Sequence, residues 1–316
     1  MRLSLLDRSR TRAGEPDATG LTSTIERAVA VEALGYDRFW VAEHHGVPGI
    51  ASGSPPVLLA ALAMRTDRIR LGSGGVMLPH HQPLVVAEQF RMLDALARGR
   101  IDLGLGRSLG FTAPVRAALR DAPDAADRFA DDVRAVLAHL DDTATVTARP
   151  RTPGPVSVSL LATGRGIELA GRLGLPVVVG GPLLSQPALA DSLAAYRRSG
   201  GPSVTISLDV VVADDDATAR ELSLPEVWAM ARSRETGEFG PLESVESIHD
   251  QSWSRLTRER VQRGLESAVA GTPATVRARL DDLRRLTGVD ELLASTSTFD
   301  RGALARSDAL LRDLLA

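Results

Sequence analysis

The sequence alternates short apolar or β-branched runs with longer segments of helical spacing, and this alternation allows few folds. Runs of four to eight such residues suit buried strands, whereas apolar residues at i, i+3, i+4 and i+7 suit helices that cover a sheet. The runs predict strands at residues 2–7, 38–43, 69–78, 100–106, 156–162, 176–180, 204–212 and 289–297. The segments between them predict helices at residues 22–34, 55–65, 84–97, 125–140, 166–173, 187–198, 274–286 and 303–315.

The order of these elements predicts an α/β fold. Ser54-Pro55 and Thr272-Pro273 support two of the helix starts, because each places an N-cap residue before a proline at the first helical position. Eight strands that each lead into a helix indicate a parallel sheet closed on itself, a (β/α)8 TIM barrel. An open doubly wound sheet is the alternative, but no strand is followed by a GxGxxG turn.

The chain is expected to form one domain over residues 1–316, since α/β barrels often use this much sequence. One segment does not fit the repeat of strand and helix. Residues 214–271 follow the seventh predicted strand and are too long for a plain loop. We therefore expect a barrel with an insertion after strand seven.

Composition excludes several classes of function. The chain has no cysteine, so disulfides, thiolate nucleophiles, iron–sulfur clusters and cysteine zinc sites are ruled out. A net charge of -3 gives no basic stripe for nucleic acid. The N-terminus "MRLSLLDRSRTRAGEP" lacks the apolar run of a signal peptide, and the longest apolar stretch, "LGLPVVVGG", is too short for a bilayer. We expect a soluble cytoplasmic protein with no membrane contact.

Histidines gather where two predicted strands end, and barrel active sites lie at such ends. The second strand ends in Glu43-His44-His45, and the third ends near His80-His81. These side chains could bind a metal, transfer a proton or cap a loop. Neighbouring residues of an extended segment point to opposite sides, so each doublet offers one ligand, and we expect no metal. His44 lies nearest a strand end and is the favoured proton-transferring residue.

A glycine-rich strand and a glycine-rich turn suggest a flat, phosphorylated ligand. Gly72, Gly74 and Gly75 weaken the third strand, which indicates either a β-bulge or a flat ring against bare backbone. The turn "ATGRG" precedes a helix whose first N–H groups can bind phosphate, and an arginine ends the fourth strand. The candidate phosphate residues are Arg107, Thr163, Gly164, Arg165 and Gly166, with the ring against Gly74-Gly75.

The stretch "YDRFWVAEHHGVPGIASGSPPVLLAALAMRTDRIRLGSGGVMLPHHQPLVVAEQFRMLDALARGRIDLGLGR", residues 36–107, resembles the bacterial luciferase-like monooxygenases. It is most similar to their single-chain oxidoreductase branch from actinobacterial biosynthetic pathways. "LAGRLGLP" and "GVDELLASTSTFD" continue the resemblance toward the C-terminus. The resemblance implies a (β/α)8 barrel that binds a flavin, usually reduced FMN delivered by a separate reductase, or in some members the deazaflavin F420.

By position, the resemblance implies that His44 is the catalytic imidazole and that Arg107 binds phosphate. It also places Gly74-Gly75 beneath the flavin ring, where relatives can have a non-proline cis peptide. Three rim loops depart from the family pattern. "ATGRG" replaces a Ser-Ser-Gly-aromatic-Ser turn, "VVVGGPLLS" an aromatic–histidine run, and "SLGFT" the usual "APGTD". These departures keep open a barrel of this family that has lost flavin binding.

The leading hypothesis is a flavin-dependent monooxygenase that oxidises a small organic substrate, such as a natural product, with reduced FMN and dioxygen. His44 would transfer the proton, and Glu43 and His45 would orient it or line the pocket. The alternatives are an F420-dependent hydride-transfer oxidoreductase and a non-redox lyase, cyclase or binding protein. The insertion, with its three large aromatic residues, would close over the site as a lid or pack as a helical decoration. Relatives dimerise through the helices after strands two and three, and apolar residues 56–64 and 83–97 predict a homodimer here.

Overall fold

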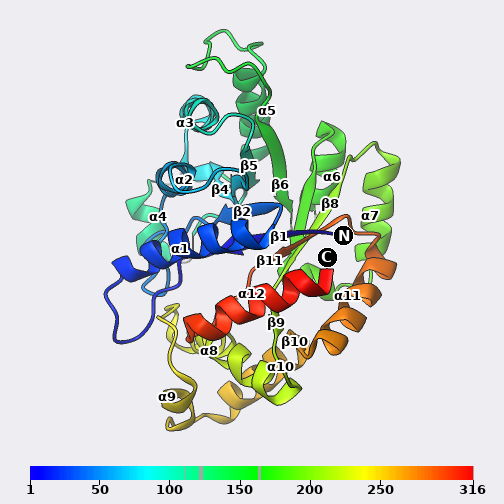
Figure 1. Ribbon diagram of the computed structural model, residues 1–316. Coiled ribbons are helices and arrows are strands. Elements are labelled where there is room, and N and C mark those ends of the chain that lie inside the picture. The colour runs from blue at the N-terminus through cyan, green and yellow to red at the C-terminus, as the bar shows by residue number, and fades with distance from the viewer. Residues whose placement is uncertain (111, 121–123, 163–164, 316) are drawn as a thin grey trace.

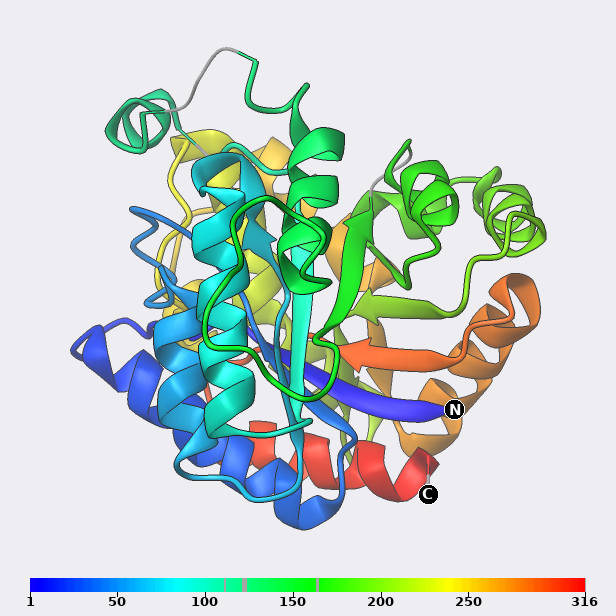
Figure 2. The ribbon, with the colours of Figure 1, turned by 90° about the horizontal axis from the view of Figure 1, so that it is seen from above.

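The computed structural model of the protein describes residues 1–110, 112–120, 124–162 and 165–315. Its parallel strands close into a barrel, and helices surround them (Figure 1 and Figure 2). The strand order is β3-β2-β1-β11-β8-β7-β6-β5-β4, and a further pairing of β3 with β5 closes the ring. The strands are β1 (Arg2–Asp7), β2 (Arg38–Val41), β3 (Arg70–Ser73), β4 (Val76–Met77), β5 (Ile101–Gly106), β6 (Ser157–Ala162), β7 (Val177–Gly180), β8 (Val204–Leu208) and β11 (Glu291–Ala294). The predicted (β/α)8 barrel is confirmed.

The predicted helices are all present, with their ends shifted by a few residues. They are α1 (Ala18–Leu34), α2 (Pro55–Ala63), α3 (Pro83–Leu96), α5 (Phe129–Leu140), α6 (Arg165–Leu173), α7 (Leu189–Arg198), α11 (Pro273–Thr287) and α12 (Arg301–Leu315). Short helices that the spacing did not predict are α4 (Ala113–Ala118), η1 (Leu78–His80) and η2 (Gly181–Ser185). No helix in the described ranges is both long and apolar enough to cross a membrane.

Two predicted strands are interrupted, and each break lies at the barrel mouth. The strand predicted at 69–78 stops at Gly74-Gly75, which are joined by a cis peptide bond, and continues as β4. The prediction of a single strand at 204–212 was wrong, because β8 ends before Asp209 and a separate strand follows it. The Asp209 carboxylate accepts hydrogen bonds from Ser295 Oγ at 2.7 Å and from Arg8 at 3.1 Å.

The chain after Asp209 leaves the barrel. Residues of β9 (Val210–Val212) pair with β10 (Val269–Gly271) in a separate two-stranded sheet. Between these two strands lie α8 (Asp216–Thr236), α9 (Val245–His249) and α10 (Arg255–Ser267), which form the lower part of the molecule in Figure 1. We call this segment, residues 214–271, the insertion.

Side chains fill the barrel, so its interior is a core and not a pore. The buried indole of Trp40 lies against Gly72, where an added Cβ would be 2.4 Å from Trp40 Nε1. At the N-terminal end of the strands, Asp102 is buried and forms ion pairs with Arg38 and Arg70, both at 2.6 Å. Because packing and ion pairs occupy the interior and the N-terminal end, the active site is expected at the opposite, C-terminal end of the barrel.

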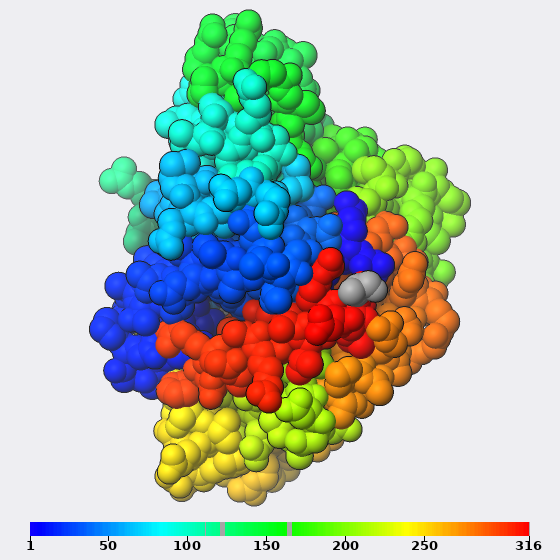
Figure 3. Space-filling view, in the orientation of Figure 1, coloured from blue at the N-terminus to red at the C-terminus, as the bar shows by residue number. Residues whose placement is uncertain are grey.

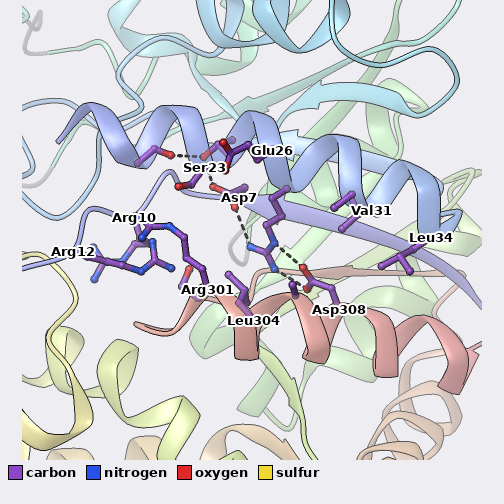
Figure 4. Close-up of a pocket in the computed structure, with 16 residues that line it drawn as sticks. Asp7, Arg10, Arg12, Ser23, Glu26, Val31, Leu34, Arg301, Leu304 and Asp308 are labelled. Carbon is purple, nitrogen blue, oxygen red and sulfur yellow. Dashed lines mark hydrogen bonds and ion pairs between the residues drawn. The ribbon is translucent and has the colours of Figure 1, made fainter. Parts of the chain in front are cut away.

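The outer layer contains a buried ion network between α1 and α12, which lie side by side (Figure 3). A cavity of about 220 Å³ is lined by residues of both helices (Figure 4). Arg27 of α1 donates to both carboxylate oxygens of Asp308 at 2.8 Å and to Asp7 at 2.9 Å. The Thr24 hydroxyl donates to Asp7 at 2.8 Å. The network therefore fixes both helices to the mouth end of β1.

Candidate active site at the barrel mouth

His44 lies three residues after the end of β2, at the C-terminal end of the barrel. Its backbone N–H donates to the Ser52 carbonyl at 2.9 Å, and Ser52 Oγ donates to the Ala42 carbonyl at 2.7 Å. The intervening loop therefore folds back on the strand end and fixes the position of His44. Gly74 N–H donates to the Val41 carbonyl at 2.8 Å, which holds the next strand end beside it.

The surroundings of His44 keep its imidazole neutral. Burial is the largest effect and disfavours the charged form, and the positive charges of Arg8 and Arg10 act in the same direction. Together they lower the pKa of His44 to about 4. At neutral pH the ring thus has one nitrogen that can accept a proton and one that can donate.

Glu43 is 2% exposed and binds three donors. Its Oε1 accepts hydrogen bonds from Nε2 of His45 and of His81, both at 2.8 Å. Its Oε2 accepts the Met77 N–H at 3.1 Å. Burial alone would raise the pKa of Glu43, but these hydrogen bonds outweigh it and lower the pKa to about 2. The carboxylate is therefore charged throughout the physiological range.

The Glu43 cluster contains one histidine from each doublet, as the alternation along an extended segment predicted. The ligand atoms of Glu43, His45 and His81 lie within 4.8 Å of one another. Among the described residues this is the one group of its kind that could hold a metal ion. The hydrogen bonds of Glu43 orient its carboxylate toward His45 and His81.

The glycines of the third strand are required by protein atoms that approach them closely. An added Cβ on Gly74 would lie 2.6 Å from Leu6 Cδ1, and one on Gly75 would lie 2.8 Å from the Gly104 carbonyl oxygen. With Trp40 against Gly72, each of the three positions has a packing reason. At Gly74-Gly75 the strand is broken and the peptide bond is cis, which is not the β-bulge that was one of the two alternatives.

The candidate phosphate residues follow two adjacent strands, β5 and β6. Arg107 is exposed at the end of β5, and its Nε donates to the Ala126 carbonyl at 3.0 Å. Helix α6 begins at Arg165, directly before Gly166. The predicted positions Thr163 and Gly164 lie outside the described residues. The structure thus brings Arg107 and the start of α6 to neighbouring strand ends.

Charged residues that the sequence analysis missed surround the other side of the mouth. Glu226, from α8, pairs with Arg8 at 3.1 Å and with Arg10 at 2.9 Å. Both arginines follow β1 and lower the pKa of His44. The charged run "DRSRTR", which begins at the last residue of the first strand, was the available signal. Its partner Glu226 lies more than two hundred residues later, and no local pattern identifies it.

The insertion packs on the barrel mouth through apolar contacts as well as through Glu226. Trp228 is buried and lies 5.1 Å from Trp253, centroid to centroid, inside the insertion. Phe239 packs with Val47 and Ile50 of the loop that follows His45, and the Arg10 guanidinium lies 4.2 Å above its ring. In this structure the aromatic residues therefore form packed contacts, both inside the insertion and between the insertion and the barrel.

Comparison with known proteins identifies the family. Residues 1–291 match the family described as luciferase-like monooxygenase. A luciferase-like monooxygenase of Escherichia coli (strain K12) is 34% identical over 333 residues, which cover 98% of this chain and 96% of the relative. The N-acetyl-S-alkylcysteine monooxygenase of Bacillus subtilis is 54% identical over 110 residues, 35% of this chain and 33% of its own length.

Solved structures agree with the sequence matches. Apo-MsnO8 is 31% identical with a TM-score of 0.88, covering 99% of this chain and 98% of that one. The oxygenating constituent of 3,6-diketocamphane monooxygenase from Pseudomonas putida, in complex with FMN, shares the fold at 16% identity and a TM-score of 0.73, covering 99% and 96%. An F420-dependent secondary alcohol dehydrogenase also shares the fold, at 14% identity and a TM-score of 0.74, and the match covers 99% of this chain and 97% of that one. Because the family match spans residues 1–291 and the relative from Escherichia coli is similar over nearly the whole chain, this protein belongs to the luciferase-like monooxygenase family and is an enzyme of that class.

Proposed function

We propose that the protein is a flavin-dependent monooxygenase that uses reduced FMN and dioxygen to oxidise a small organic substrate. The observation that carries the proposal is the neutral His44 held beside the Gly74-Gly75 strand end. The local identity of 54% to the N-acetyl-S-alkylcysteine monooxygenase supports a small-molecule substrate and dioxygen as reactants. A separate reductase would deliver the reduced flavin.

The described residues fit a flavin phosphate and ring. Arg107 offers an exposed guanidinium at the end of β5, and the first N–H groups of α6 lie at the end of the adjacent β6. Gly74-Gly75 would lie next to the ring. When bound, reduced flavin supplies the electrons that activate dioxygen, and the protein supplies position, polarity and exclusion of water.

Proton transfer and the positioning of rim side chains are assigned to residues of this chain. His44 takes a proton at its unprotonated ring nitrogen and releases one from the other, because its lowered pKa keeps it neutral. Arg8 and Arg10 oppose its protonation. Glu43 acts as a positioning residue, since its hydrogen bonds fix His45 and His81 at the rim. We assign no metal to this cluster.

Anaerobic titration of the apo protein tests the cofactor. We expect reduced FMN to bind at tens of micromolar or tighter, and product to form when oxygen is admitted. Binding of F420 without reduced FMN would instead support hydride transfer without oxygen. If neither bound, the diverged turn after β6 would favour a non-redox barrel of the same family. These outcomes separate the three candidate functions.

We also propose that the chain works as one domain, residues 1–316 with the insertion at 214–271, and as a homodimer. Helices α2 and α3 pack on each other and leave large apolar side chains exposed. Val57 is 72% exposed, Met64 63% and Met92 55%. A second copy that covers this face would remove their apolar surface from water. Light scattering at micromolar concentration tests the dimer mass.

A further inference from the structure

A second, larger cavity opens at the barrel mouth and extends under the insertion. Its volume is about 860 Å³, within the range of small-molecule sites. Residues at the ends of β1, β8 and β11 line its inner part, and residues of α8, α10 and α11 line its outer part. The cavity therefore extends from the insertion to Leu6 and Arg8 at the barrel mouth.

Helix α10 turns one face to this cavity. Its lining residues, Arg260, Arg263, Gly264 and Ser267, follow the i, i+3, i+4, i+7 spacing of a single helical face. The lining residues of α8 and α11 show the same spacing. Each of the three helices therefore presents one continuous face to the same cavity.

The outer part of the cavity is strongly cationic. Four arginines line it: Arg234, Arg260, Arg263 and Arg279. None of them forms an ion pair with a carboxylate in the described part of the chain. Nη1 of Arg260 is buried and has no hydrogen-bond partner among the described residues. A buried donor without an acceptor is costly, so an anionic ligand would stabilise this arrangement.

The acidic residues of the same cavity are already neutralised by other partners. Asp209 pairs with Arg8 at 3.1 Å, and Glu226 pairs with Arg8 at the same distance and with Arg10 at 2.9 Å. Asp282 forms its ion pair with Arg285. The arginines of the outer part therefore retain an uncompensated positive charge.

The cavity also offers apolar surface. Met230 of α8 and Leu286 of α11 line it and remain 44% and 60% exposed. Leu6 lines its inner end and is the side chain that packs against Gly74. A ligand with an apolar body would cover these side chains while its charged group reached the arginines.

We propose that this cavity binds the substrate, and that the substrate is an organic anion with an apolar body. The apolar part would lie toward Leu6, and the anionic group would lie at Arg260 and Arg263. The assignment as substrate rests on the proposed function, but binding to the cavity does not require flavin. The two can therefore be tested separately.

Calorimetric titration of the flavin-free protein with octanoate and 1-octanol tests the charge preference, because the probes share a chain length. At low salt we expect octanoate to bind roughly tenfold more tightly than 1-octanol. In an Arg260→Gln/Arg263→Gln variant, octanoate affinity should fall about tenfold while 1-octanol affinity stays unchanged. The control is Arg258→Gln, which removes one of the positive charges of the same helix outside the cavity lining.

Equal binding of the two probes, binding of neither, or equal losses in the cavity variant and the Arg258 control would overturn the inference. The same variants should be titrated anaerobically with reduced FMN, for which we expect no change. Selective loss of FMN would show that these arginines hold the flavin phosphate, which also overturns the substrate assignment. If octanoate shows the expected preference but reduced FMN never binds, the proposed function fails and the anion site stands.

Discussion

Replacing Glu43 by glutamine tests the hydrogen-bond cluster at the rim without changing its volume. The carboxylate accepts two imidazole donors on one oxygen and a backbone N–H on the other. A glutamine has one accepting oxygen, and its amide nitrogen donates. With the amide nitrogen toward Met77, its N–H faces another donor. With it toward His45 and His81, both rings must change tautomer to accept, and the charge-assisted hydrogen bonds are lost.

The expected loss of stability follows from the contacts. Hydrogen bonds to charged groups contribute about 1.5–3 kcal/mol each. Because the His45 and His81 side chains are 26% and 30% exposed, water partly screens them, and we expect a net loss of about 2–3 kcal/mol. For 316 residues the entropy of unfolding is about 0.7 kcal/mol/K, which converts the loss to a Tm decrease of about 3–5 °C.

The effect should depend on pH in a defined direction. The hydrogen bond to Glu43 raises the pKa of His45 above its usual 6.5. The resulting stabilisation is fully present below pH 6.5 and is lost as pH rises through the raised pKa. Glu43 stays charged across this window because its pKa is about 2. Glu43→Gln should therefore lower Tm more at pH 6 than at pH 9.

Differential scanning calorimetry at both pH values, with the exposed Glu246→Gln as control, measures this. The control should shift Tm little, since surface substitutions usually change stability by less than about 0.5 kcal/mol. A Glu43→Gln variant as stable as the wild type, or one whose deficit does not change between pH 6 and pH 9, would contradict the reasoning.

Four further outcomes are expected. His44→Asn should slow substrate oxidation about 10²–10⁴-fold in a reduced-FMN assay while Tm stays unchanged, and full activity would remove His44 from the mechanism. Arg27→Met should cost about 3–5 kcal/mol in urea unfolding, because it leaves two buried carboxylates unpaired, whereas the exposed Arg134→Met should cost little. Met92→Asp should convert a dimer to a monomer in light scattering, and a wild-type monomer would refute the proposed interface. Elemental analysis of untagged protein should find no stoichiometric metal, and bound zinc or iron would reassign the Glu43 cluster.

Much of the fold could be predicted because side-chain direction repeats with a fixed period in strands and helices. The period located every strand of the barrel and placed the histidine doublets at strand ends. It failed at 204–212, where the apolar run continues past Asp209 although the chain changes sheets. Sequence period records which residues are apolar, but it does not record which strand they pair with.

The glycines of the third strand show a similar limit. The sequence indicated that something approaches them closely, and it left open a ligand or a bulge. The structure identifies Trp40, Leu6 and the backbone of β5 as the approaching groups. Close approach between segments depends on barrel closure, which no local spacing encodes.

By itself, the sequence determined the barrel, the family resemblance and the position of His44 at a strand end. Only the tertiary structure decided that Glu43 binds His45 and His81, that Glu226 pairs with Arg8, and that α8, α10 and α11 enclose one arginine-lined cavity. The physical reason is the separation in sequence between the residues that determine each feature. Element type is set by residues within a few turns of one another, whereas the partner of a charge is set by whichever distant segment the closed barrel brings within hydrogen-bonding distance.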